Sequence, residues 1–338
     1  MLKIKIGEVC DVYDGPHATP KKIDKGPVYL GIDAITDNGK LNPSGYNYLS
    51  EEDYKIWTKR VTPQYGDLVF SYEATLGRYA LIPKDFYGCL GRRLAVVRPK
   101  DERINIKWLY YYFLSPEWSV YIANNTVKGS TVNRISIEDF PNFYIPLLER
   151  TEQDKIVKVL SAIDEKIDNN VNINDNLQSQ LRLIYENMIA KANSNQIKGN
   201  FVTVKEMADI TTGKEDANFS TVNGKYKFFT CSNVPLQCDE YAFESSSILI
   251  AGNGDFNVKY YSGKFNAYQR TYVLTASSEY YAILYLACLY QVNLFKSNSS
   301  GSIVKFITKS DVENIPLFIP DDISLLQKLN NLLHFQEQ

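Results

Sequence analysis

The chain contains an internal duplication, because residues 1–165 and 199–338 carry similar motifs in the same order. The matched segments are IKIGEVCDVYDG (4–15) with VTVKEMADITTG (202–213), DLVFSY (67–72) with SILIAG (247–252), RRLAVV (92–97) with QRTYVL (269–274), WLYYYFLSP (108–116) with ILYLACLYQ (283–291), and GSTVNRISIEDFPNFYIP (129–146) with GSIVKFITKSDVENIPLFIP (301–320). Such a repeat indicates one structural unit that occurs twice. A length of 338 residues also favours two domains.

Each copy combines strand-like and helix-like segments. The short apolar runs at 67–72 and 92–97 and their counterparts predict buried strands, and the aromatic stretches at 108–116 and 283–291 predict packed helices. The predicted fold class is α+β, with two mixed α/β domains in tandem pseudo-symmetric repeat. The predicted limits are 1–150 for the first domain, 151–197 for a long helix, 198–320 for the second domain and 321–338 for a shortened second helix.

A long helix is predicted between the two copies. Thr151 is its expected N-cap, with Asp154 three residues on as in a capping box, and the helix should end near Lys191. Steps of four and three residues indicate a coiled-coil seam, whose members are Ile156, Leu160, Ile163, Ile167, Asn170, Asn174, Leu177, Leu181, Ile184 and Met188. The two central asparagines would fix register at a cost in stability. The alternative is an amphipathic helix that lies on its own domain.

The second copy begins the same helix in DDISLLQKLNNLLHFQEQ. At an offset of 173 residues, Lys328, Leu329, Leu332 and Leu333 correspond to Lys155, Ile156, Val159 and Leu160. Gln338 then corresponds to residue 165, so the last 26 residues of the first helix have no counterpart. We therefore expect part of the seam between Ile167 and Met188 to be available to another chain.

Charge and composition exclude several classes of protein. The net charge of −2 is spread evenly, at +2 for residues 1–150 and −2 for each of 151–197 and 198–338, so any DNA contact must use local clusters. No apolar run approaches the roughly 20 residues of a membrane span. The N-terminus lacks the apolar core of a signal peptide, and we expect a cytoplasmic protein. The five cysteines contain no CxxC pair and should be reduced thiols.

Catalytic signatures are weak. AGNGD (251–255) resembles a Gly-rich cofactor turn, but its repeat counterpart is SYEAT and no amphipathic helix follows it directly. The sequence contains no Walker A string and no Asn-Pro-Pro-Tyr-like motif of an adenine methylase. Two histidines, His17 and His334, do not make a metal or nuclease site with the scattered carboxylates. We expect no catalytic residue, no metal and no cofactor in this chain.

Taken together, these segments resemble a specificity (S) subunit of a Type I restriction-modification system over the whole chain. In the first copy the resemblance is carried by DGPHATPKK, GPVYLGI, GDLVFS, GRRLAVVRP and IPLLERTEQDKIVKVLSAID. In the second copy it is carried by TTGKEDANF, YKFFTCSN, ILIAGNGDFNVKYYSGKFNAYQRTYVL and GSIVKFIT. The shortened final helix is a departure from the family pattern.

The resemblance implies two target-recognition domains, separated by an antiparallel pair of spacer helices, that read a split double-stranded DNA target. It also implies partner subunits that carry the chemistry. Methyltransferase (M) subunits, two in number, would methylate adenine with S-adenosylmethionine, and restriction (R) subunits would cleave with ATP and Mg. The seam, about 50 Å long at 1.5 Å per residue, is comparable to roughly 15 base pairs.

For base reading we select polar residues in loops beside the recurring motifs, because such side chains meet base edges or phosphates. The candidates in the first copy are His17, Thr19, Lys21, Lys22, Tyr72, Arg78, Arg92, Arg93, Lys128 and Arg134. Those in the second copy are Lys214, Asp216, Asn218, Asn253, Asn257, Lys259, Tyr268, Gln269, Arg270 and Lys305. The pairs Arg92/Arg93 and Gln269/Arg270 are the strongest, because they occupy equivalent positions.

Two other classes stay open on the sequence. A non-DNA scaffold or adaptor would use the long helix for assembly, and its behaviour would be independent of DNA sequence. A stand-alone methyltransferase would bind S-adenosylmethionine by itself.

Overall fold

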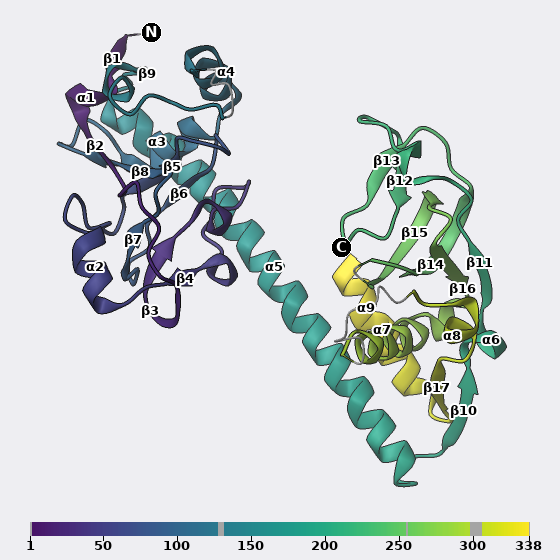
Figure 1. Cartoon of the computed structure of the whole chain (residues 1–338). Coiled ribbons are helices and arrows are strands. Elements are labelled where there is room, and N and C mark those ends of the chain that lie inside the picture. The colour runs from purple at the N-terminus through teal and green to yellow at the C-terminus, as the bar shows by residue number, and fades with distance from the viewer. Residues whose placement is uncertain (1, 128–131, 255, 298–305, 338) are drawn as a thin grey trace. The chain divides into compact units, whose positions relative to one another are not determined.

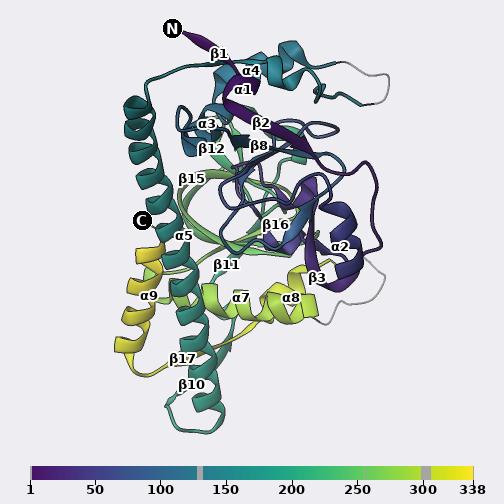
Figure 2. The same cartoon turned by 90° about the vertical axis from the view of Figure 1, so that its left-hand side faces the viewer.

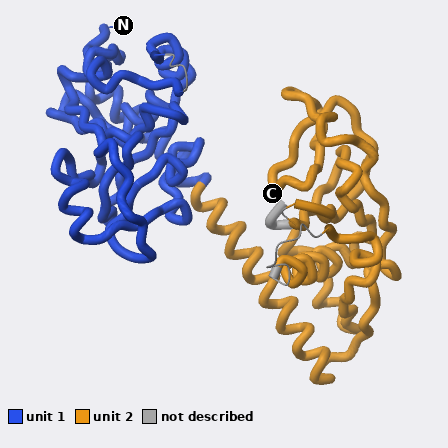
Figure 3. Tube along the Cα trace, in the orientation of Figure 1, with its two compact units in different colours: residues 1–167 blue, residues 168–338 orange. Residues whose placement is uncertain are grey.

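The computed structural model describes residues 2–127, 132–254, 256–297 and 306–337, without the side chains of 297 and 334–337. The chain divides into two compact units, unit 1 (Met1–Ile167) and unit 2 (Asp168–Gln338), shown in Figure 3. The division falls within one helix, so the limits expected from sequence, 1–150, 151–197, 198–320 and 321–338, stay a prediction.

Unit 1 is built around a four-stranded and a three-stranded sheet (Figure 1). Its strands are β1 (Lys3–Lys5), β2 (Cys10–Asp14), β3 (Ile23–Leu30), β4 (Asn47–Tyr48), β5 (Leu68–Ser71), β6 (Tyr79–Leu81), β7 (Gly88–Leu90), β8 (Leu94–Pro99) and β9 (Tyr144–Pro146). Its α-helices are α1 (Ile6–Val9), α2 (Glu51–Trp57), α3 (Ile106–Phe113), α4 (Pro116–Asn125) and the start of α5 (Arg150–Asn193).

Unit 2 is built around a six-stranded sheet. Its strands are β10 (Gly199–Thr203), β11 (Asp209–Thr212), β12 (Tyr226–Phe229), β13 (Leu236–Cys238), β14 (Phe243–Ala251), β15 (Val258–Ala267), β16 (Thr271–Thr275) and β17 (Pro316–Pro320). Its α-helices are the remainder of α5 together with α6 (Val204–Met207), α7 (Tyr281–Ser297), α8 (Lys309–Glu313) and α9 (Ile323–Glu337).

The two units share one topology, which confirms the duplication and the α+β fold class. The strand order β2-β8-β5-β6 in unit 1 recurs as β11-β16-β14-β15 in unit 2. The two-stranded pair β1-β9 recurs as β10-β17, and the aromatic helix α3 recurs as α7. The sequence matches at 67–72, 92–97 and 108–116 therefore mark the same elements in both copies.

One strand distinguishes the copies. In unit 2 the long strand β15 pairs with β14 through its first part and lies parallel to β12 through its last three residues. In unit 1 two separate strands make these pairings. β6 pairs with β5, and β7 lies parallel to β3. Besides the two-stranded pair in each unit, unit 1 consequently has a four-stranded and a three-stranded sheet where unit 2 has one six-stranded sheet.

Both faces of each central sheet are covered, which explains the continuous apolar runs. On β14, Ile248 and Ile250 join the core beneath α7, whereas Leu249 joins a second cluster on the opposite face. On β5, Leu68 and Phe70 face α3 and α4, whereas Val69 faces the other side. Alternate residues of a strand point to opposite faces, so a strand buried on both is apolar throughout.

The repeated N-terminal motif has a structural cause. Glu8 and Glu206 each sit three residues into a one-turn helix and accept a hydrogen bond from the backbone N–H before it. Lys5 N donates to Glu8 Oε1 at 3.2 Å, and Thr203 N donates to Glu206 Oε2 at 2.7 Å. Both copies therefore retain the glutamate of a capping box.

The helix α5 begins two residues earlier than an N-cap at Thr151 predicts. Its first residue is Arg150, and the N–H groups of Glu152 and Gln153 donate to Glu149 O. The expectation that Thr151 is the N-cap is therefore wrong, since Thr151 lies inside the first turn. Asp154 accepts instead from Arg150 and Asn105, each through Oδ1. The second helix, α9, begins at Ile323, 173 residues after Arg150, as the repeat predicts.

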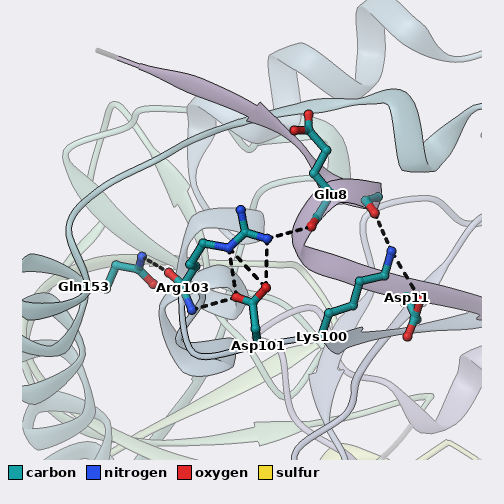
Figure 4. A network of polar contacts seen from close by, with 7 residues as sticks. Glu8, Asp11, Lys100, Asp101, Arg103 and Gln153 are labelled. Carbon is teal, nitrogen blue, oxygen red and sulfur yellow. Dashed lines mark hydrogen bonds and ion pairs between the residues drawn. The ribbon is translucent and has the colours of Figure 1, made fainter.

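A polar network fastens the start of α5 to unit 1 (Figure 4). Gln153 is fully buried, and its Oε1 accepts from Asn105 N at 2.7 Å. Its Nε2 donates to Arg103 O at 2.8 Å and Leu148 O at 2.9 Å. The Arg103 guanidinium in turn donates hydrogen bonds to the Asp101 carboxylate and to Glu8 O, the latter at 2.9 Å. This network joins α5 to the turn after β8 and to α1.

The C-terminal part of α5 packs in the core of unit 2, beside α7 and α9 (Figure 2). Leu181 is 0% exposed and Met188 is 3% exposed, and the ring centroids of Tyr185 and Tyr290 on α7 are 6.0 Å apart. The expectation that this section of the seam is open to another chain is therefore wrong for Leu181 and Met188. For these turns the alternative of a helix lying on its own domain is correct.

The preceding part of α5 carries the exposed seam residues. Ile163 is 50% exposed and Ile167 is 53% exposed, and Asn170 and Asn174 also lie at the surface. Apolar residues beside the seam are exposed as well, namely Val159, Val171 and Ile173. The counterparts of Ile156 and Leu160 on α9, Leu329 and Leu333, are buried in unit 2.

Candidate DNA interface

Two equivalent turns carry the strongest candidates. The 91–94 turn joins β7 to β8, and the 268–271 turn joins β15 to β16. Each is closed by a backbone hydrogen bond, from Leu94 N to Gly91 O at 3.1 Å and from Thr271 N to Tyr268 O at 2.8 Å. Arg92/Arg93 and Gln269/Arg270 therefore occupy the two central positions of the same turn, where side chains reach solvent.

Backbone bonds attach both turns to the chain in the same way. Tyr72 N donates to Arg93 O at 3.1 Å in unit 1, and Gly252 N donates to Arg270 O at 2.9 Å in unit 2. Tyr72 and Gly252 each stand at the start of a loop. In these loops Ala74 (φ 68°) and Gly254 (φ 71°) both take the left-handed conformation that favours glycine. Gly254 of the AGNGD string is thus the counterpart of Ala74 of SYEAT in conformation as well as in sequence.

Two further backbone bonds recur around the turns. Gly15 N donates to Leu94 O at 2.9 Å, as Gly213 N donates to Thr271 O at 3.1 Å. The other pair runs from Ile135 N to Tyr72 O and from Ile307 N to Gly252 O. Gly213 is required here, because a Cβ would lie 2.1 Å from Ala267 O.

Tyrosine hydroxyls support the turn in unit 1. Tyr72 Oη donates to Arg92 O at 2.8 Å, and Arg92 N donates to Tyr29 Oη at 3.3 Å. Tyr72 is only 4% exposed, and burial raises the pKa of its hydroxyl to about 12. Tyr72 therefore holds the turn from inside and does not belong to its exposed surface, contrary to our expectation from the sequence.

The side chains on the turns have different neighbours. Arg93 Nε lies 3.2 Å from Glu73 Oε1, at an angle outside hydrogen-bond geometry, so the contact is an ion pair. In unit 2, Gln269 Nε2 donates to Asp216 Oδ1 at 2.8 Å, and Arg270 is exposed. Sequence reasoning missed Glu73 and Tyr29. The repeat offered a signal for Glu73, since it directly follows the strand that matches SILIAG.

Surface hollows lie beside both turns. In unit 1 a hollow of about 190 Å³ is lined by Arg92 and Arg93, and a larger one of about 730 Å³ by His17 and Arg134. In unit 2 a hollow of about 330 Å³ is lined by Gln269 and Arg270. A macromolecule that contacts either turn could thus place protruding groups in a recess.

The other candidates of unit 1 are divided between surface and internal contacts. Thr19, Lys21 and Lys22 are exposed on the loop after β2, and His17 Nε2 lies 3.0 Å from Asp14 Oδ2. Arg78 is held by Ile35 O and by Asp37. Arg134 is exposed and forms backbone bonds with Val127. Lys128 lies outside the described residues.

In unit 2 the candidates also separate into two groups. Lys214 and Asn218 are exposed on the loop after β11, and Asn253 and Tyr268 are partly buried. Asn257 Nδ2 donates to Cys231 O at 2.8 Å, and Lys259 Nζ donates to Thr230 O and Asn257 Oδ1, so these two brace a loop. Lys305 lies outside the described residues.

The described residues contain no group of three or more His, Cys, Asp or Glu placed to hold a metal ion. No helix in the described ranges is both long enough and apolar enough to span a bilayer. The five cysteines are free, and burial raises the pKa of the Cys10 and Cys89 thiols to about 12.

The two units have the same fold and carry equivalent turns, but the exposed side chains on those turns differ. The chain therefore belongs to a class of two-unit proteins in which one repeated scaffold carries two different surfaces. The family model for the Type I restriction modification DNA specificity domain matches residues 2–179 and 196–330. The chain therefore belongs to the specificity-subunit family of Type I restriction-modification systems, whose members are non-catalytic.

Individual relatives agree with this family. The chain is 38% identical over 135 residues to the Type I restriction enzyme EcoDI specificity subunit of Escherichia coli, covering 39% of this chain and 30% of the relative. It is 30% identical over 104 residues to the putative Type I restriction enzyme MjaX specificity subunit of Methanocaldococcus jannaschii, covering 30% of this chain and 23% of the relative. The matches thus span less than a third of either relative.

A solved structure shares the fold. The Type I restriction-modification S subunit from M. genitalium matches with a TM-score of 0.60 at 18% sequence identity. The match covers 100% of this chain and 89% of that one.

Proposed function

We propose that this chain is a sequence-specific DNA-binding specificity subunit that reads a split double-stranded target, one half-site per unit. In this proposal it directs two M subunits, together with R subunits, to that target. Adenine methylation with S-adenosylmethionine and cleavage with ATP and Mg would take place in those partners. The chain itself would supply recognition, in the cytoplasm.

The pair of equivalent turns is the observation that carries this proposal. Four backbone hydrogen bonds recur around the 91–94 and 268–271 turns, while the exposed side chains change from Arg-Arg to Gln-Arg. Arg and Gln are side chains that bind base edges in the major groove with two hydrogen bonds. A constant scaffold with changed Arg and Gln side chains suits two half-sites of different sequence.

The weak overall charge fits reading within an assembly. Neutralisation of phosphates by basic residues supplies a large share of DNA affinity. A chain of net charge −2 contributes little to this electrostatic part of the affinity. Basic surfaces on partner subunits would then provide affinity, and the two units would provide sequence discrimination.

Genome-wide adenine mapping tests the proposal. The full chain is expressed with its M subunit in a host that lacks other adenine methylases, and methylated positions are read by sequencing. We expect one bipartite motif with an unread gap. Arg92→Ala should relax only the half-site that unit 1 reads, and Arg270→Ala only the other. A co-expressed active M subunit that methylates no defined motif would contradict the proposal.

A second function, assembly without DNA reading, is favoured by the exposed apolar side chains of α5. Ile163, Ile167 and Val171 are each at least 50% exposed on consecutive turns. We propose this stretch as a surface for a partner subunit or for another chain that completes a helix pair. Ile163→Glu with Ile167→Glu should then abolish co-purification with the M subunit. The scaffold function would be favoured if the complex still assembled without DNA, and independently of salt, after the central side chains of both turns were replaced.

A further inference from the structure

The two turns differ in which of their central side chains is held by the protein. In unit 1 the second position is held, since the Arg93 guanidinium lies beside Glu73. The Arg92 side chain is exposed and makes no hydrogen bond or ion pair within the part of the chain that the structure describes. The 91–94 turn therefore presents one unpaired guanidinium, at its first central position.

In unit 2 the arrangement is reversed. The first position is held, because Gln269 Nε2 donates to Asp216 Oδ1. The counterpart of Glu73 is Asn253, which has no charge to pair with an arginine. Arg270 is exposed, and its side chain has no partner among the described residues. Unit 2 therefore also presents one unpaired guanidinium, at the second central position.

We propose, resting on the function proposed above, that Arg92 and Arg270 are the specificity-determining residues of their turns and that each reads a guanine. The planar guanidinium matches the O6 and N7 acceptors of guanine, and this is the commonest specific contact in the major groove. Glu73 and Asp216 are positioning residues that hold the neighbouring side chain on the protein. Each half-site accordingly contains a guanine.

Local charge favours a base over a phosphate as the ligand. In unit 1 the carboxylate of Glu73 stands beside one of the two arginines and offsets its charge. In unit 2 the carboxylate of Asp216 lies beside the only other central side chain, which is neutral. A turn that served to neutralise phosphates would gain from free cations and lose from nearby carboxylates. A single exposed guanidinium, beside a side chain that the protein holds in place, instead suits contact with the edge of one base.

The test uses the full chain in complex with its M subunit and a duplex that carries the mapped target. Each guanine of the two half-sites is replaced in turn by 7-deazaguanine, which lacks the N7 acceptor. The wild-type complex should bind about 5-fold or more weakly at one guanine of each half-site, since a full bidentate contact discriminates about 5- to 150-fold. Arg92→Ala should bind the unmodified duplex as weakly and show no further loss at that guanine.

Arg92→Lys is the matched control, because it retains the positive charge but loses the planar fork. It should bind the unmodified duplex more weakly than wild type, because an ammonium does not reproduce the fixed fork that the guanidinium presents to O6 and N7. Recovery of wild-type affinity by lysine, sensitivity that persists in Arg92→Ala, or a half-site without guanine would each overturn the guanine assignment. If any of these occurs while the complex still methylates a defined split motif, the proposed function stands and only this inference fails. Absence of any motif would overturn both.

Discussion

Gln153 offers a quantitative test of how the long helix is fastened to unit 1. We consider Gln153→Leu, because leucine is similar in size and already occupies the equivalent position in unit 2, as Leu326. The substitution removes three hydrogen bonds, which leaves Asn105 N, Arg103 O and Leu148 O without their partner. Gln153 is fully buried, so water does not readily replace its amide.

Each of the three polar groups that lose their partner costs about 1–3 kcal/mol. Burial of the new leucine offsets part of this cost. The expected loss in the free energy of unfolding of unit 1 is therefore about 3 kcal/mol. For a unit of this size, 1 kcal/mol shifts Tm by about 2–4 °C, so unit 1 should melt about 6–12 °C lower. Tryptophan fluorescence reports this directly, because Trp57, Trp108 and Trp118 all lie in unit 1.

A matched control exists in unit 2. Asn330 on α9 accepts from Ala282 N at 2.9 Å and donates to Glu279 O at 2.7 Å, which fastens α9 to the start of α7. Asn330→Leu should lower the midpoint seen by far-UV circular dichroism and leave the tryptophan signal unchanged. If Gln153→Leu keeps the wild-type tryptophan midpoint, or if Asn330→Leu shifts it equally, the reasoning from these contacts is refuted.

Three further predictions follow from single sites. Iodoacetamide at pH 8 should label the native protein at Cys231 alone, with four more adducts after urea, since the other thiols are buried; mass spectrometry of tryptic peptides checks this, and native adducts elsewhere would contradict it. Arg103 lowers the pKa of Asp101 to about 2 from 3.8. The part of the Arg103→Ala stability loss that comes from Asp101 should thus be full above pH 4 and disappear as the pH falls through 2, while the part from the hydrogen bond to Glu8 O stays, as measured by urea midpoints; a difference independent of pH would refute this. Gly213→Ala should make unit 2 sensitive to limited proteolysis, because its Cβ would lie 2.1 Å from Ala267 O, whereas Gly31→Ala, whose Cβ would have no atom within 4 Å, should leave unit 1 resistant; resistance of unit 2 in Gly213→Ala would show that the turn can move aside.

Much of the fold could be predicted because the repeat compares the sequence with itself. Paired apolar runs such as 67–72 and 247–252 located strands whose two faces are buried, and the offset of 173 residues located the start of α9. The seam on α5 was harder to interpret. Spacing by three and four residues is shared by a coiled coil and by a helix packed on its own domain. Tertiary contacts with α7 and α9, which decide between them for Leu181 and Met188, are not visible in local spacing.

The candidate site was predicted less completely. Position within the repeat correctly placed Arg92/Arg93 and Gln269/Arg270 on equivalent turns. Residue type alone could not separate Tyr72, which is buried against Arg92 O, from a tyrosine that meets a ligand. The partners of Arg93 and Gln269 also come from loops distant in sequence, so their pairing required the folded chain.

The bonds that close the two turns, and those that recur in both units, run from main chain to main chain, and this bears on how such proteins diversify. No central side chain of either turn is needed to close it, since Leu94 N and Thr271 N meet carbonyl oxygens. Substitutions at residues 92, 93, 269 and 270 should therefore leave folding intact. A library randomised at these four positions would yield mostly well-folded proteins, and new DNA preferences could be selected from it without a compensating change elsewhere in the chain.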